Sequence, residues 1–193
     1  MKRRYSKLVS ATAVTVIASL LLLVGLPNSQ AKIECHPDQV QLQNQGAIGL
    51  GGRTVLGQTF VPGAPGQQVC QVKVHINKNL AAAGNLTLHL LRSNLAELDA
   101  AVTIPGGLIP MGPSVQVFNF GCNGAALAGN PFYGLKLESQ GSPVGAYSWR
   151  GIGGNPYARP GAAGRGWRNV NAGAGNWTAL GAWDFAFQIY MCD

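Results

Sequence analysis

The stretch GAWDFAFQIY (residues 181–190), close to the end of the chain, decides the fold. Its large apolar side chains occupy every second position: Trp183, Phe185, Phe187 and Ile189. A period of two with aromatic and β-branched residues indicates a β-strand with one face on the core, whereas an amphipathic helix would repeat every 3.6 residues. We therefore expect a closing strand clamped by earlier ones, with these four side chains buried and Asp184 on the opposite face.

Similar alternating runs recur upstream, separated by turns rich in glycine and proline. The clearest is VCQVKVHIN (69–77), and NLTLHLLR (85–92) follows it, so the two are expected to form an antiparallel hairpin. Three further runs are expected to be strands: TVLGQTFV (54–61), SVQVFNF (114–120) and FYGLKLES (132–139). Eight to ten short strands without crossover helices predict an all-β fold, an antiparallel two-sheet sandwich that is jelly-roll-like.

The first 31 residues have the layout of a secretory signal peptide. A basic start precedes an apolar run (9–26) that Pro27 ends, and small residues at Ser29 and Ala31 favour cleavage after Ala31. An uncleaved membrane anchor is the less favoured alternative, because the apolar run is long enough to span a bilayer. After cleavage we expect no membrane contact and a secreted, extracellular protein, or a periplasmic one in a Gram-negative cell.

The remaining chain divides into an N-terminal lead-in (32–53) and a β-sandwich domain (54–193). Four of the fourteen basic residues belong to the signal, so ten remain against seven acidic ones, a net charge of +3. Three charges spread over one domain make no basic patch, so a nucleic-acid partner is not expected.

Four cysteines follow the signal, and an even number in an exported chain predicts two disulfides. Three pairings are open. We favour Cys70–Cys122 and Cys35–Cys192, the second of which would tie the first mature residues to the last. The spacing of the cysteines has no metal-ligand rhythm, which disfavours a zinc site.

Catalytic signatures are weak. No two carboxylates alternate on an expected strand as a glycosidase requires, and no GxSxG motif occurs, so an enzyme is not expected. His75 and His89 are expected to face each other across the hairpin, where two imidazoles could hold a metal. Polar cross-strand pairs are common without any function, and this simpler interpretation is favoured.

Asp184 is the only charge in the aromatic closing strand. One hypothesis makes it a ligand of a structural calcium ion whose shell is completed by loop carbonyls. The favoured alternative is an outward-facing carboxylate paired with Arg150, Arg159 or the backbone.

Aromatic residues with polar neighbours gather in and beside the glycine-rich region 151–175. The ligand-binding hypothesis takes in six residues: Tyr147, Trp149, Tyr157, Trp167, Trp177 and Arg168. Exposed rings would stack on sugars while Arg and Asn side chains bind hydroxyls. The alternative, that the rings plug the ends of the sandwich, carries somewhat more weight.

A further set of runs keeps a recognisable order: GQTFVP (57–62), LTLHLL (86–91), VQVFNF (115–120), FYGLKL (132–137), NPYARPG (155–161) and WDFAFQIY (183–190). This order resembles secreted bacterial jelly-roll modules of the carbohydrate-binding or choice-of-anchor type. The resemblance implies a β-sandwich with an extracellular location, and it names no ligand.

Three functions follow in order of preference. The first is a non-catalytic protein that binds an extracellular ligand, a glycan or another surface polymer. The second is a structural or adhesive cell-surface protein with a protein partner. The third is an enzyme with an unrecognised site.

Overall fold

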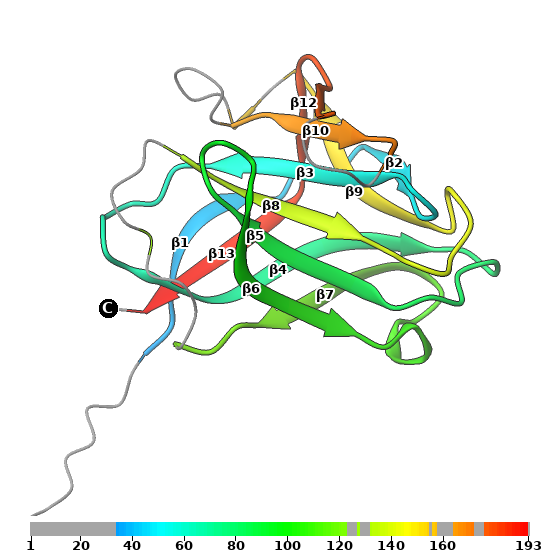
Figure 1. Cartoon of the computed structure of the whole chain (residues 1–193), viewed down its shortest axis with the longest axis horizontal. Helices are drawn as coiled ribbons and strands as arrows, with labels where there is room; N and C mark the ends of the chain where they lie inside the picture. Colours follow the sequence, from blue (N-terminus) through cyan, green and yellow to red (C-terminus); the bar gives the residue numbers. More distant parts are fainter. Residues whose placement is uncertain are drawn as a thin grey trace, which may run out of the picture. The chain divides into compact units, whose positions relative to one another are not determined.

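A computed structural model of the chain describes residues 34–122, 127, 132–154, 156–157, 164–171 and 176–192. The expected signal peptide and Arg159 lie outside this part of the chain. Within it the protein is an antiparallel sandwich of two sheets, which lie one behind the other in Figure 1. The all-β prediction is confirmed. No helix in the described ranges is long and apolar enough to cross a membrane.

The seven-stranded sheet has the order β1-β13-β4-β9-β12, with β2 paired to β9 and β7 paired to β4. Its strands are β1 (His36–Gln41), β2 (Gly46–Leu50), β4 (Gln68–Lys78), β7 (Gly112–Asn119), β9 (Tyr147–Gly153), β12 (Trp183–Phe185) and β13 (Phe187–Cys192). The segment expected as a lead-in therefore supplies two strands, β1 and β2, to this sheet.

The six-stranded sheet has the order β11-β10-β3-β8-β5-β6. Its strands are β3 (Val55–Phe60), β5 (Leu86–Leu91), β6 (Glu97–Ile104), β8 (Tyr133–Glu138), β10 (Gly166–Asn169) and β11 (Thr178–Ala179). A short 3-10 turn (Gly106–Leu108) lies between β6 and β7. The thirteen strands of the described ranges exceed the eight to ten expected, because β2 and β11 lack a clear alternating pattern and the closing run is divided into β12 and β13.

The expected hairpin of 69–77 and 85–92 is wrong. β4 pairs with β7, β9 and β13, whereas β5 pairs with β6 and β8 in the other sheet. Both strands have one apolar face, and two strands that cover a core from opposite sides show the same alternation as two neighbours. His75 and His89 consequently lie on the outer faces of opposite sheets and cannot share a metal ion.

The closing stretch fills the core as its alternation predicts. Phe185, Phe187 and Ile189 are fully buried, whereas Trp183 is only partly so. The run is broken into β12 and β13 at Ala186, whose N–H donates to the carbonyl of Arg150 (2.8 Å) and whose carbonyl accepts from the N–H of His75 (3.4 Å). The last segment therefore changes its partner at Ala186: β12 pairs with β9, and β13 pairs with β4.

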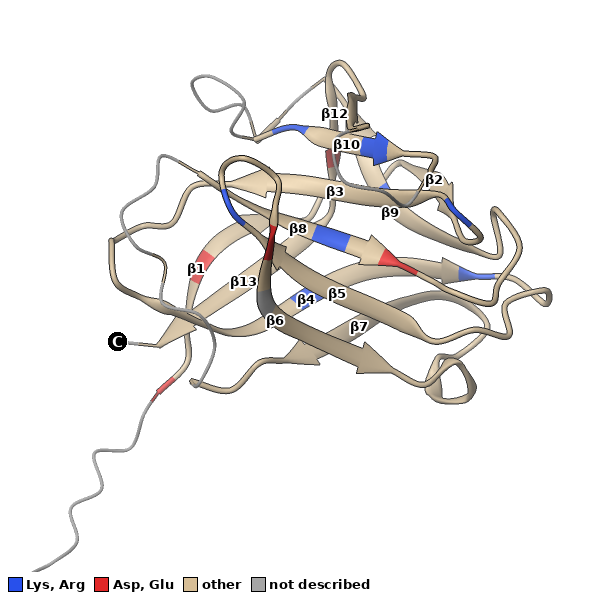
Figure 2. Ribbon diagram, in the orientation of Figure 1, with Lys and Arg blue, Asp and Glu red and all other residues tan. Residues whose placement is uncertain are grey.

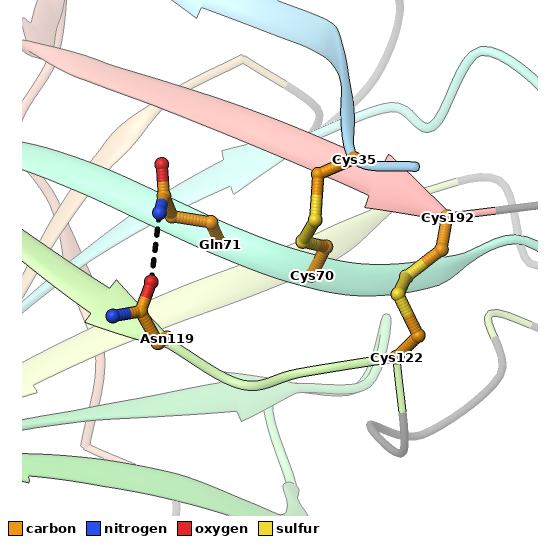
Figure 3. Close-up of a disulfide and its surroundings, with 6 residues drawn as sticks. All are labelled: Cys35, Cys70, Gln71, Asn119, Cys122 and Cys192. Atoms are coloured by element: carbon orange, nitrogen blue, oxygen red, sulfur yellow. Dashed lines mark hydrogen bonds between the residues drawn. A yellow bond between two sulfur atoms is a disulfide. The ribbon is translucent and has the colours of Figure 1, made fainter. Parts of the chain in front are cut away.

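The disulfides are Cys35–Cys70 and Cys122–Cys192, so the favoured pairing is wrong. Figure 3 shows all four cysteines together where β13 and β4 lie side by side, near the Gln71–Asn119 hydrogen bond that joins β4 to β7. Their four Sγ atoms lie within 4.8 Å of one another. Because all four meet at one place, neither spacing nor strand parity could distinguish the pairings.

Candidate functional site

The structure divides the six residues of the predicted ligand site. Tyr147 and Trp149 on β9 are fully buried. The Trp149 ring stacks on Phe185 with centroids 4.6 Å apart, and its Nε1 donates to the carbonyl of Ala186 (3.0 Å). The Tyr147 hydroxyl donates to the carbonyl of Gly84 (2.8 Å). These two rings belong to the core, as the alternative interpretation holds.

Tyr157 is also buried, at 7% exposed, and packs edge-on against Phe187. Its backbone N–H donates to Asp184 Oδ2 (2.8 Å), and its hydroxyl bonds to the Gln39 side chain. The ring therefore anchors the described 156–157 segment to the core, and it presents no face to solvent for a ligand.

Asp184 is fully buried, so the expectation of an outward-facing carboxylate is wrong, whereas its expected pairing with the backbone is present as the hydrogen bond from the N–H of Tyr157. Gln58 Nε2 donates to its Oδ1 (3.3 Å), while Gln58 Oε1 accepts from the N–H of Phe185 (2.8 Å). Burial raises the pKa of the Asp184 carboxyl, and the hydrogen bonds from Tyr157 and Gln58 offset part of that rise. The carboxylate thus links β12 to β3 of the other sheet.

The calcium hypothesis for Asp184 stays a prediction. Within the described ranges, the cysteines form the one group of three or more His, Cys, Asp or Glu side chains close enough to share an ion. A calcium ion at Asp184 would thus draw its other ligands from amide and carbonyl oxygens.

Trp167 and Trp177 are the two rings of the set that remain partly exposed. Leu56 and Phe60 of β3 point into the core, so Gly57 between them faces outward from the six-stranded sheet. Trp167 is the cross-strand neighbour of Gly57 on β10, and a Cβ atom at position 57 would lie 3.0 Å from the Trp177 ring. Both rings therefore flank Gly57, and the exposed Arg168 follows on the same strand.

Four residues that are cross-strand neighbours on the outer face of this sheet form one line, with one residue from each of four strands. Gly57 is paired with Trp167 on one side and with Lys136 of β8 on the other, and Lys136 is paired in turn with His89 of β5. We call Trp167, Gly57, Lys136 and His89 the Trp–His row. At about 4.8 Å per strand, the row spans roughly 14 Å.

The polar end of the row is a charged cluster that the sequence analysis missed. Lys136 Nζ lies 2.5 Å from Glu97 Oε1 and 2.9 Å from Glu138 Oε2, and His89 Nε2 lies 3.0 Å from Glu138 Oε1. His89 Nδ1 reaches Glu97 Oε2 at 3.3 Å. Figure 2 shows the basic and acidic residues of β8 close to an acidic residue of β6. The Lys-x-Glu spacing in 136–138 was the available signal, because alternate residues of a strand share a face.

Within the cluster, Glu138 and Lys136 both stay charged at neutral pH. The hydrogen bond from His89 is the largest cause that lowers the pKa of Glu138 to about 2; burial opposes it, and Lys136 adds to the lowering. Burial works against the charge of Lys136, but hydrogen bonds to Glu138 and Glu97 prevail and raise its pKa. A carboxylate that stays ionised at neutral pH is a poor general acid.

No protein-family model matches the chain, and no curated protein matches it either.

Proposed function

We propose that the protein is an exported, disulfide-bonded β-sandwich that binds a glycan or similar surface polymer on the outer face of its six-stranded sheet. The observation that carries the proposal is the Trp–His row, which sets an aromatic ring in line with a cation and an imidazole. The resemblance to secreted jelly-roll modules of the carbohydrate-binding or choice-of-anchor type is compatible with an extracellular function, although it names no ligand.

The chemistry of the row matches a sugar chain. A sugar ring presents C–H bonds on its faces and hydroxyls around its rim, so it is attracted to the negative face of an indole and to polar groups beside it. Trp167 and Trp177 supply indoles, while the half-exposed carboxylate of Glu97 and the Thr87–Thr103 hydroxyl pair (2.9 Å) supply polar groups on neighbouring strands; Lys136 is buried beneath Glu97 and holds it in place. Regular strands hold these groups in fixed positions, which lowers the entropy lost on binding.

The two disulfides fit an oxidising compartment, which is where extracellular polymers are met. A signal peptide in residues 1–31 would take the chain there. Export and glycan binding together make a protein that works outside the cytoplasm.

The test is a glycan array with the mature protein, followed by titration of the best ligand with Trp167→Ala and Trp177→Ala. Loss of one stacked ring is expected to weaken binding roughly tenfold, since an aromatic contact contributes about 1 kcal/mol beyond the area it buries. Tyr190→Ala is the matched control, because Tyr190 is a partly exposed ring on β13 of the other sheet. It should leave the affinity unchanged.

Two results would overturn the proposal. One is an array on which no glycan binds. The other is a glycan whose affinity is unaffected by both tryptophan substitutions. If a protein partner were lost with the same substitutions, the adhesive function would take its place.

A further inference from the structure

The outer face of the seven-stranded sheet has a depression of about 220 Å³. It is lined by Asn44, His75, Pro113, Ser114, Val115 and Arg150. Its position follows from the break in the closing segment. The N–H of His75 and the carbonyl of Arg150 both bond to Ala186, so the two residues lie on either side of the point where β12 gives way to β13.

The polar groups of the depression are mostly donors. Arg150 Nη2 donates to the carbonyl of Asn44 (3.0 Å), and its buried Nε has no hydrogen-bond partner among the described residues. The Ser114 side chain is not one of these donors: Ser114 pairs with the buried Ile76 of β4, so its hydroxyl lies on the inner face of β7, where it accepts from Gln116 Nε2 (2.8 Å).

His75 is also set up as a donor. Its Nδ1 lies 3.0 Å from Asn44 Nδ2, and an amide nitrogen can only donate. Nδ1 must therefore accept, so the proton of the neutral ring is on Nε2. Burial, and then the charge of Arg150, lower the pKa of His75, which keeps the ring neutral at neutral pH.

No residue that lines the depression is acidic, so the charge of Arg150 is not balanced locally. Lys73 projects from the same face of β4 two residues before His75, with its Nζ 3.0 Å from the Tyr190 hydroxyl. The carboxylates of the charged cluster belong to the other sheet. A cationic hollow rich in donors is complementary to an oxyanion.

We propose that this depression binds an oxyanion, a carboxylate or sulfate group carried on a saccharide, with Arg150 as its charge partner and His75 Nε2 as a donor. Val115, which is 48% exposed, supplies an apolar rim against which the body of the sugar packs. The inference goes beyond the proposed function, because its residues lie on the opposite sheet from the Trp–His row.

The test is isothermal titration of the mature protein with four probes at low salt. The probes are oligogalacturonate, a sulfated dextran oligomer, uncharged dextran of the same length, and inorganic sulfate. The two charged saccharides should bind and uncharged dextran should not; weaker binding of inorganic sulfate would show that the sugar body contributes. Arg150→Gln should weaken binding at least tenfold, whereas Arg92→Gln, which removes an equal charge from an exposed site just after β5 of the other sheet, should change it less than twofold.

Equal losses from Arg150→Gln and Arg92→Gln would overturn the proposal, since attraction would then be nonspecific. If Arg150→Gln fails to fold, the imidazole NMR signals of His75 in the unaltered protein decide the question. They should shift on addition of oligogalacturonate, and an absence of shift at saturation would refute the site. Trp177→Ala should leave this binding intact, so the two proposals can fail separately.

Discussion

Asp184 shows what a strand pattern can and cannot predict about a single residue. The alternation of the closing stretch correctly places Phe185, Phe187 and Ile189 in the core. The same alternation puts Asp184 in solvent, but Gln58 and the backbone of Tyr157 approach from distant parts of the chain and bury it. Hydrogen-bond partners of this kind are set by tertiary packing, and a single sequence does not display them.

Tertiary packing also decides which aromatic rings are buried and which stay exposed. Tyr147 and Trp149 occupy alternate positions of β9, on the face that packs against the core, so both rings are buried. Trp167 stays partly exposed because it shares the outward face of Gly57. The composition of the region suggested a binding site, and only the pairing of β10 with β3 shows which rings remain available.

For the single residue Glu138, we predict how the stability of the fold depends on pH. Its pKa of about 2 in the folded protein lies below its ordinary value of 4.5, so the ionised carboxylate stabilises the fold above pH 4.5. That stability is lost as the pH falls from 4.5 towards 2. We expect Glu138→Gln to lower the free energy of unfolding at pH 7 by about 1 to 3 kcal/mol, because Lys136 and His89 lose a charged partner.

The measurement is denaturant unfolding of both proteins between pH 7 and pH 2. The difference between them should shrink as the pH falls below 4.5. If the free energies of unfolding of the two proteins differed by the same amount at every pH, His89 and Lys136 would not lower the pKa of Glu138, and the prediction would fail.

At the scale of elements, strands were easier to predict than their partners. The runs at 69–77 and 85–92 both became strands, β4 and β5, yet they lie in different sheets. Alternation reports that one face is buried but not which side of the core the strand covers. Short strands such as β11 have too few residues for any period to show.

The disulfide pairing was also hard to predict from the sequence, because the strand order brings all four cysteines to one place. β13 lies between β1 and β4, and β7 pairs with β4, so the strand order gathers the cysteines of these four strands and their ends at one place, where Cys35 is joined to Cys70 and Cys122 to Cys192. That order could not be read from the sequence, and so the pairing could not either.

The Cys122–Cys192 bridge closes 70 residues and holds the end of β13. Replacing both cysteines by serine should cost about 4 kcal/mol by the chain-entropy estimate, and urea unfolding would measure it. The matched control is the double serine variant of Cys35 and Cys70, whose shorter loop predicts a slightly smaller loss. Non-reducing peptide mapping that links Cys35 to Cys192 would contradict the assignment.

At the scale of the whole molecule, the two outer faces differ in chemistry. The six-stranded sheet presents tryptophans and a cluster in which positive and negative charges are paired. The seven-stranded sheet presents Arg150, His75 and Lys73 around a shallow hollow. A sandwich with both faces equipped in this way could hold two parts of one polymer, or two different ligands.

The most direct test of glycan binding is the footprint of the bound ligand on the backbone amide NMR spectrum. The best ligand from the glycan array would be titrated into isotope-labelled protein. We predict that the largest shifts fall on β10, β3 and β8, around Trp167, Gly57 and Lys136. Shifts confined to the seven-stranded sheet, or to the edges of the sandwich away from these strands, would contradict the proposed function.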